Sequence, residues 1–413
     1  MTKFLLVVAL VVSGACSDRP PATGAPSPSP TAPTRTPPVA AAEVPAPLGN
    51  PFIAIDTHVD TPQRMLDDGD DISQRLPDGH LDLPRMREGG LTGAFFSIWV
   101  NPRRFVGEAA WQRALALIET VVSVSRRHPE EATLCTTADQ VRQAARDGKI
   151  AILMGVEGAH ALGTEDPQIS IERLRELHRL GVRYMTITWS NDNPLGHSSG
   201  GDHRELGLTD LGRAVIADMN RLGMLVDVSH VSDRTFSDIL DIATRPVLAT
   251  HSSARALADH PRNMTDAMIR RVADNHGAVC VNYYTRFIDA EYNARRQRLE
   301  RQHAAQFREL ERDHPRSSQR AGPESALVRQ LAPDLEQPTL AVLGRHFDHI
   351  VRLAGPETAC LGSDFDGVGE LPVGLEDVSK LPALRAELER RGLDVRAIFG
   401  ENVLRVLQAN HVR

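Results

Sequence analysis

Short apolar runs and longer amphipathic stretches alternate along the chain from residue 51 onward. Eight runs are rich in β-branched residues and have the length of buried strands; they span residues 52–56, 92–100, 150–158, 182–189, 223–230, 246–252, 277–284 and 357–367. Stretches with helical periodicity lie between them, including 108–127, 170–180 and 209–222, the last two with Ser170 and Thr209 as expected N-caps. This alternation predicts βα units and a parallel sheet.

Eight such units between residues 51 and 413 predict a (β/α)8 TIM-type barrel. The alternative is an open doubly wound sheet, but no glycine-rich phosphate loop follows the first strand. A charged stretch, residues 291–314, is inserted between the seventh and eighth strands and is expected to be helical. We favour a solvated excursion, with a lid or a homodimer contact over the active face as the alternative.

The first fifty residues have a different character. Residues 1–15 carry one positive charge at Lys3, then an apolar run and small residues, which predicts a secretory signal peptide too short to span a bilayer as a mature helix. The small residues before Cys16 resemble the lipobox of bacterial lipoproteins, so we expect lipidation at Cys16; a plain cleaved signal is the alternative. Residues 16–50 are rich in Pro, Ala and Thr and predict a solvated linker before a folded domain over 51–413. The protein is thus expected to be an exported, membrane-attached lipoprotein of the cell envelope, in the periplasm.

Composition narrows the choice of partners. With 41% hydrophobic and 24% charged residues the chain is an ordinary globular protein. A net charge of −7 gives no basic footprint, so no nucleic-acid partner is expected. Cys280 and Cys360 lie in apolar strand-like runs, where we expect buried thiols rather than a disulfide framework.

Metal-binding or acid–base side chains follow five of the eight apolar runs. In a barrel, the carboxyl ends of all strands meet at one face. Each of these residues has an ordinary structural role when taken alone, such as a hydrogen-bonded histidine or an aspartate N-cap. Their recurrence at one topological position favours a functional site instead; the set comprises His58, Asp60, Glu157, His230, His251 and Asp364.

The donor types in this set indicate the metal. Three imidazoles with carboxylates and no thiolate suit zinc or another borderline divalent ion. One catalytic zinc usually has three protein ligands, so this set is too large for one ion. Two metal ions that share one carboxylate would use it fully.

Several segments carry a resemblance to a known family. "DTHVD", "GVEGAH", "GVRYMTITW", "VNYY" and "GSDFDG", together with residues 208–232 and 246–266, resemble the membrane (renal-type) dipeptidases, a binuclear zinc branch of the amidohydrolase-like barrels. The resemblance runs in order through nearly all of 52–410. It implies hydrolysis of short peptides with a free C-terminal carboxylate and two Zn²⁺ per chain.

The same resemblance implies roles for the metal-binding residues. His58 and Asp60 would bind the first zinc, and His230 and His251 the second. Glu157 would bridge the two ions and belong to the catalytic group.

Further residues are assigned to substrate and proton transfer in the same way. Arg262 would hold the substrate's C-terminal carboxylate, a task that suits a guanidinium fork. Asp364 would carry the proton between water and the leaving amine. Tyr284 and Trp189 are placed among the substrate-binding residues.

Trp189 departs from the family pattern. The fourth strand of the family usually reads T-x-T-H, and that histidine stabilises the oxyanion, but here the segment is "TITW". An indole can donate one hydrogen bond but carries no positive charge, and loss of such a donor commonly costs about two to three orders of magnitude in turnover. His197 in the following loop is one candidate substitute; a different substrate range and weak activity are the alternatives.

These observations favour a zinc dipeptidase, which the family resemblance suggests is tolerant of D-residues at the C-terminal position. One alternative is a binuclear amidohydrolase that acts on lactams or N-acyl amino acids. The other is a non-catalytic peptide-binding lipoprotein, for which Trp189 is the best argument. The complete set of metal-binding residues with an acid–base partner argues against the latter.

Overall fold

The computed structural model describes residues 52–314 and 317–412. Within these residues, eight parallel strands form a closed barrel. Each strand pairs with the next one around the barrel, and the ring closes through β9 with β1 and β2 with β4. The predicted (β/α)8 barrel is therefore confirmed. The barrel strands are β1 (Ile55–Val59), β2 (Gly93–Trp99), β4 (Ile150–Glu157), β5 (Val182–Thr186), β6 (Leu225–Asp227), β7 (Leu248–Ala249), β8 (Ala278–Val281) and β9 (Ala359–Leu361).

One further strand, β3 (Ala132–Leu134), lies outside this ring. It pairs with the first three residues of β4, whereas β5 begins to pair with β4 only at Met154. The sequence pattern did not indicate β3, because three residues are too few to show a period.

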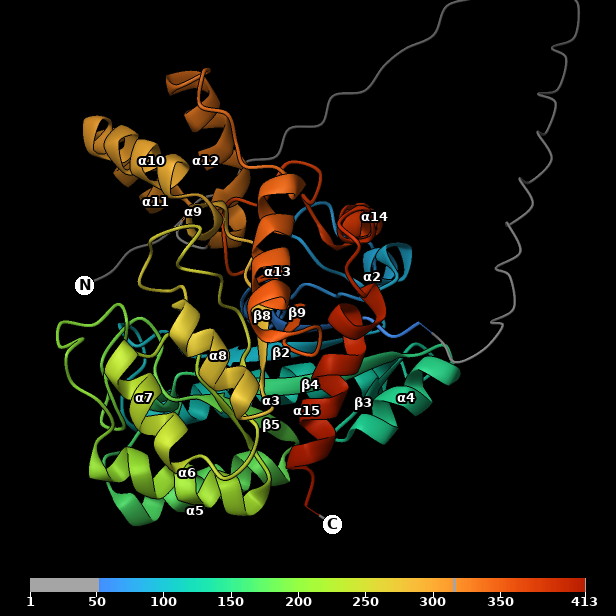
Figure 1. Cartoon of the computed structure of the whole chain (residues 1–413), viewed down its shortest axis with the longest axis vertical. Coiled ribbons are helices and arrows are strands. Elements are labelled where there is room, and N and C mark those ends of the chain that lie inside the picture. The colour runs from blue at the N-terminus through green and yellow to red at the C-terminus, as the bar shows by residue number, and fades with distance from the viewer. Residues whose placement is uncertain (1–51, 315–316, 413) are drawn as a thin grey trace, which may run out of the picture. The chain divides into compact units, whose positions relative to one another are not determined.

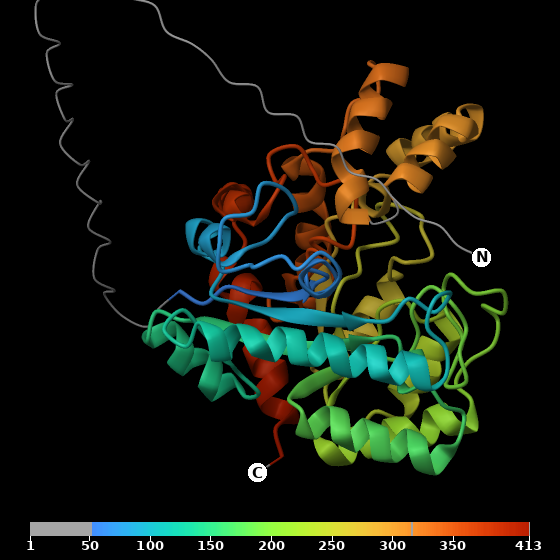
Figure 2. The same cartoon turned by 180° about the vertical axis from the view of Figure 1, so that it is seen from behind.

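Helices surround the barrel, and α3 (cyan to green in Figure 2) contacts β2 and β4. The predicted helix over 108–127 is confirmed by α3, and the N-cap at Thr209 is confirmed by its hydrogen bond from Gly212 N. The N-cap at Ser170 is wrong, because α5 begins at Pro167 and is capped by Asp166. The helices around the barrel are α2 (Leu83–Gly89), α3 (Glu108–Arg127), α4 (Ala138–Arg146), α5 (Pro167–Arg179), α6 (Asp210–Leu222), α7 (Asp233–Ile242), α8 (Asp266–Asp274), α13 (Leu340–Ala354), α14 (Leu381–Arg390) and α15 (Asn402–Asn410), with the short α1 (Pro62–Asp67) and α9 (Thr285–Ile288) beside the strand ends.

The barrel interior is filled by side chains and supports the active face from below. A Cβ atom at Gly155 would lie 2.0 Å from the ring of Tyr184, so only glycine leaves room for this ring inside the barrel. Tyr184 is fully buried and its hydroxyl lies 2.8 Å from Nδ1 of His58. The packing of the core therefore fixes a side chain of the candidate site.

The cysteine prediction is wrong for two residues. Cys280 and Cys360 form a disulfide between the neighbouring strands β8 and β9, with Cα atoms 4.1 Å apart. An apolar run shows that each residue is buried, but only the closure of the barrel brings the two into register. Cys135 is a buried free thiol.

Helices α10 (Ala290–Gln302), α11 (Ala304–Asp313) and α12 (Ser317–Leu331) lie together beyond α9 (Figure 1). The stretch expected to be helical is occupied by α10 and α11. A fully buried arginine, Arg296, joins α10 to the loop after β9 through Glu370 (2.9 Å) and to α12 through Glu324 (2.6 Å). Buried ion pairs thus hold α10 against the barrel, which a freely solvated excursion would not require.

No helix within residues 52–314 and 317–412 has both the length and the apolar character needed to cross a membrane. The signal peptide, the linker and Cys16 lie outside the described residues.

Candidate metal centre

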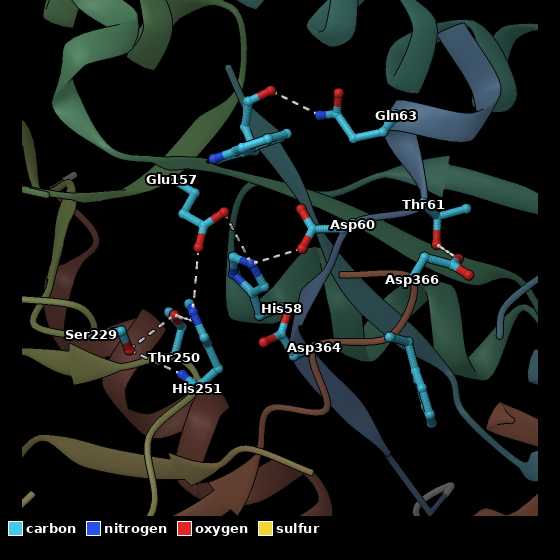
Figure 3. A network of polar contacts seen from close by, with 12 residues as sticks. His58, Asp60, Thr61, Gln63, Glu157, Ser229, Thr250, His251, Asp364 and Asp366 are labelled. Carbon is cyan, nitrogen blue, oxygen red and sulfur yellow. Dashed lines mark hydrogen bonds and ion pairs between the residues drawn. The ribbon is translucent and has the colours of Figure 1, made fainter. Parts of the chain in front are cut away.

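Five strand ends bring the six predicted residues together. Figure 3 shows five of them, His58, Asp60, Glu157, His251 and Asp364. The strands concerned are β1, β4, β6, β7 and β9. All six side chains are buried. The structure thus places together the residues that the sequence predicted to be together; they are His58, Asp60, Glu157, His230, His251 and Asp364.

Glu157 lies between the histidines. Its Oε1 atom is 2.9 Å from Nε2 of His230 and 3.4 Å from Nε2 of His251. Its other oxygen, Oε2, is 3.7 Å from Nε2 of His58, which is in turn 3.6 Å from Oδ2 of Asp60. One carboxylate oxygen therefore faces His230 and His251 and the other faces His58, as expected of a residue that can bind two metal ions.

Hydrogen bonds at the far ring nitrogens orient two of the histidines. Nδ1 of His58 contacts the Tyr184 hydroxyl, and Nδ1 of His251 lies 2.8 Å from Oγ1 of Thr250. Thr250 donates in turn to Oδ2 of Asp227 at 2.7 Å. Because the Thr250 hydroxyl donates to Asp227, it accepts from Nδ1 of His251, so that Nε2 of His251 presents its lone pair to the centre.

Two residues of the centre have left-handed backbone conformations. The φ angles of His230 and Asp364 are both 65°, a region that non-glycine residues seldom occupy. Hydrogen bonds hold these turns: Ser199 N donates to the carbonyl of His230 at 2.7 Å, and Asp364 N donates to the carbonyl of His58 at 3.1 Å. Strain of this kind is commonly retained where it aims a functional side chain.

Burial and neighbouring charges shift the pKa values across the centre. Burial lowers the pKa of His58, but Glu157, Asp60 and Asp364 outweigh it and raise this pKa to about 10. Burial, with Asp60 adding to it, raises the pKa of Asp364 to about 6. The carboxylates thus favour a positive charge at the position of His58 Nε2.

The pKa values of the other two histidines shift in the opposite direction. Burial, with Arg262 and His58 adding to it, lowers the pKa values of His230 and His251 well below the ordinary histidine value. Neutral imidazoles next to a buried carboxylate are the donor set of a divalent transition metal.

The donor atoms themselves fit a metal. Among the described residues, Nε2 of His58 and Oδ1 of Asp60 are buried and have no hydrogen-bond partner. Unpaired buried polar atoms are costly, and a cation supplies the missing partner. Ligand atoms come within 4.8 Å of one another in two groups that share His58, namely His58–Glu157–His251 and His58–Asp60–Asp364.

A cavity of about 470 Å³ opens above the centre and contains the remaining predicted residues. Arg262 is buried, and its Nη2 donates to the carbonyl of His251 at 3.1 Å. Its Nε and Nη1 atoms have no partner among the described residues, which leaves two donors for a ligand. Phe287 and Tyr284 line the same side of the cavity. The ring centroid of Phe287 lies 5.5 Å from the guanidinium carbon of Arg262.

Trp189 lines the cavity as predicted, whereas His197 does not. The Trp189 ring packs on Trp99 with centroids 5.1 Å apart and lies 6.4 Å from the ring of His230. Nδ1 of His197 instead contacts the carbonyl of Gly207 at 2.8 Å, and His197 is not among the lining residues. His197 therefore does not replace the missing family histidine.

Two contributions were missed at the sequence level. Asn282 donates to Oδ2 of Asp364 at 2.9 Å and holds this carboxylate in place. The loop after β2 supplies Arg103 and Arg104 to the cavity wall, next to Trp99 at the end of β2. Its signal was visible, because "WVNPRRF" follows an apolar run in the same way as the other strand ends.

Gly367→Ala is expected to inactivate the protein without unfolding it. A Cβ atom at Gly367 would lie 2.2 Å from Oδ2 of Asp60 and 2.3 Å from Oδ1 of Asp364, so both carboxylates must move. Displacement of this size commonly costs about 100-fold in rate. Peptide turnover and the midpoint of thermal unfolding check this prediction. The matched control is Gly322→Ala on α12, where a Cβ meets nothing within 4 Å; equal turnover of the two variants would contradict it.

A barrel with this cluster at the carboxyl ends of its strands defines a metal-dependent hydrolase. The family model of the membrane dipeptidases (Peptidase family M19) matches residues 46–413. The chain belongs to this family, as its motifs indicated, and is therefore a metallo-dipeptidase that acts on peptides.

Two solved metallopeptidase structures are similar to this chain, and a third shares its fold. The chain is 28% identical to dipeptidase AC, a metallopeptidase of family M19, with a TM-score of 0.70 over 87% of this chain and 98% of that one. A metallopeptidase from Rhodobacter sphaeroides, liganded with a phosphinate mimic of the dipeptide L-Ala-D-Ala, is 27% identical, with a TM-score of 0.70 over 87% of this chain and 100% of that one. The probable dipeptidase PvdM from Pseudomonas aeruginosa shares the fold, with 23% identity and a TM-score of 0.73 over 87% and 95% of the two chains.

Proposed function

We propose that the protein is a binuclear zinc dipeptidase that cleaves dipeptides with a free C-terminal carboxylate. The observation that carries this proposal is the position of Glu157, with one oxygen facing His230 and His251 and the other facing His58. In the proposed arrangement His58 and Asp60 would hold one ion, His230 and His251 would hold the other, and Glu157 would serve both. A zinc pair, when bound, polarises a carbonyl and activates water.

The residues around the pair position the substrate. Arg262 binds the C-terminal carboxylate through its two unpaired donors. This contact places the scissile carbonyl over the centre, beside Trp189, whose indole is the proposed donor to the oxyanion. Asp364, held by Asn282, accepts a proton from water and delivers it to the leaving amine.

Tolerance of a D-residue at the C-terminal position is part of the proposal. The Rhodobacter sphaeroides metallopeptidase is liganded with a mimic of L-Ala-D-Ala. In the present protein Tyr284 and Phe287 line the cavity beside Arg262, so this wall would contact the side chain of the C-terminal residue.

We also propose that the protein is exported and attached to a membrane through a lipid on Cys16. The apolar run and small residues before Cys16 support this location. The Cys280–Cys360 disulfide also supports it, since such bonds persist in oxidising compartments. Mass spectrometry of the membrane fraction tests the anchor; an unmodified, soluble mature chain would overturn it.

Turnover of paired L,L- and L,D-dipeptides by the purified protein, each with its C-terminal amide as control, tests the proposed activity. Hydrolysis of both acids with little hydrolysis of the amides is the expected result. Hydrolysis of lactams or N-acyl amino acids in place of dipeptides would overturn the proposal in favour of a different amidohydrolase.

Arg262→Ala is expected to raise KM for dipeptides by about 100-fold and to change kcat less, because a charge-assisted hydrogen-bond pair of about 3 kcal/mol is lost. The dipeptide amide serves as an internal control, since it lacks the carboxylate. An unchanged KM, or an equal loss with the acid and the amide, would contradict the assigned role.

A further inference from the structure

The loops after β2 and β7 face each other across the centre. Around the ring, β4, β5 and β6 lie between these two strands on one side, and β8, β9 and β1 on the other. Arg262 lies in the loop after β7, and residues 100–107 follow β2. A dipeptide that is bound by its C-terminal carboxylate at Arg262 and cleaved at the centre therefore directs its N-terminal residue toward the loop after β2.

This loop begins directly beside the centre. Trp99, the last residue of β2, is in register with Glu157, the last residue of β4. Nε1 of Trp99 is buried and has no hydrogen-bond partner among the described residues. Trp99, Asn101, Arg103, Arg104 and Phe105 line this side of the cavity.

Four arginines line this part of the cavity, and two of them are neutralised. Arg113 pairs with both carboxylate oxygens of Asp67 at 2.8 and 2.9 Å. Arg64 is ion-paired with Asp70, Asp78 and Asp366.

The other two arginines on this part of the cavity wall are Arg103 and Arg104. Neither has a carboxylate partner within residues 52–314 and 317–412, and both are exposed at the cavity wall. The Arg104 guanidinium lies 5.6 Å from the centroid of Phe105, a contact that restricts where it can point. Helices α11 and α12 add one charge of each sign to the cavity, Glu311 and Arg320, so the excess positive charge on this wall comes from the loop after β2.

We propose that Arg103 and Arg104 form a subsite for an acidic side chain on the N-terminal residue of the substrate, so that glutamyl and aspartyl dipeptides are preferred. The inference rests on the proposed function, because the direction of the substrate is fixed by Arg262. An aliphatic linker of one or two carbons carries the second carboxylate away from the scissile bond toward the guanidinium groups, while the ring of Phe105 contacts the linker.

The test compares L-Glu-L-Ala with L-Gln-L-Ala, which differ in charge and hardly in shape. We expect kcat/KM of the wild-type protein to favour L-Glu-L-Ala about tenfold, as for charge-assisted hydrogen bonds at a partly exposed site. The Arg103→Gln/Arg104→Gln double variant is expected to bring this ratio close to one. Arg270→Gln, an exposed arginine on α8 outside the cavity, is the matched control and should keep the wild-type ratio.

The ratio also separates the subsite from the activity on which it rests. A wild-type ratio near or below one, with both dipeptides hydrolysed, would overturn the subsite and leave the dipeptidase activity standing. A double variant that keeps the full preference would overturn it as well, because the preference would then come from other residues. If neither dipeptide is hydrolysed by the metal-loaded protein, the proposed function fails and the subsite fails with it.

Discussion

Glu157→Gln is expected to lose most of its bound metal and to lower dipeptide turnover by about three orders of magnitude or more. The Glu157 oxygens face all three histidines of the centre, and the amide of glutamine can offer only one uncharged oxygen. A metal ion contributes several kcal/mol to transition-state stabilisation, and each ~1.4 kcal/mol corresponds to a factor of ten in rate.

Metal analysis and turnover on one sample of this variant check the prediction. Glu336→Gln is the matched control, because Glu336 is an exposed glutamate outside the cavity. The thermal midpoint of Glu157→Gln should stay near that of the wild-type protein without metal, which separates loss of metal from loss of fold. Wild-type metal content together with wild-type turnover would show that Glu157 is not shared between two ions.

Asp364→Asn is expected to lower kcat by about 10²–10⁴, the usual contribution of a positioned acid–base group. The variant keeps the size of the side chain, and its carbonyl oxygen can still accept the hydrogen bond from Asn282. KM should change little, because the proposed partner of the substrate carboxylate is Arg262 rather than Asp364.

Metal content decides how such a loss is interpreted. Asp364 also belongs to a group with His58 and Asp60 that is close enough to hold an ion. The prediction for Asp364→Asn is therefore a low kcat with full metal content. A low kcat together with loss of one ion would make Asp364 a ligand and leave the proton transfer to another residue.

The barrel and the centre were predictable from the sequence for the same reason. Parallel strands that are buried on both faces appear as continuous apolar runs, as β4 does with all eight residues buried. Metal-binding and acid–base residues then follow at the carboxyl ends of five of the eight runs, which is where Glu157, His230 and His251 are found. Local pattern and global fold agree at these positions.

The features that were not predicted depend on contacts between distant segments. The Cys280–Cys360 disulfide requires the register of β8 against β9, and the attachment of α10 requires Glu370 from the loop after β9. The position of His197 depends on its contact with the carbonyl of Gly207. No spacing in the sequence contains this information.

Part of the cavity wall was also not predicted, for a different reason. The candidate metal ligands were apparent from their chemistry, but the cavity wall also includes Trp99, Arg103 and Arg104, whose types are common in exposed loops. Their importance follows from where β2 lies in the ring, opposite β7 and Arg262.

The number of zinc ions per chain, measured on the purified protein together with turnover of L-Ala-L-Ala and L-Ala-D-Ala, tests the binuclear centre most directly. We expect two zinc ions per chain, loss of turnover when a chelator removes them, and recovery when zinc is restored. Full turnover with one ion or none would contradict the shared role of Glu157 and the binuclear centre with it.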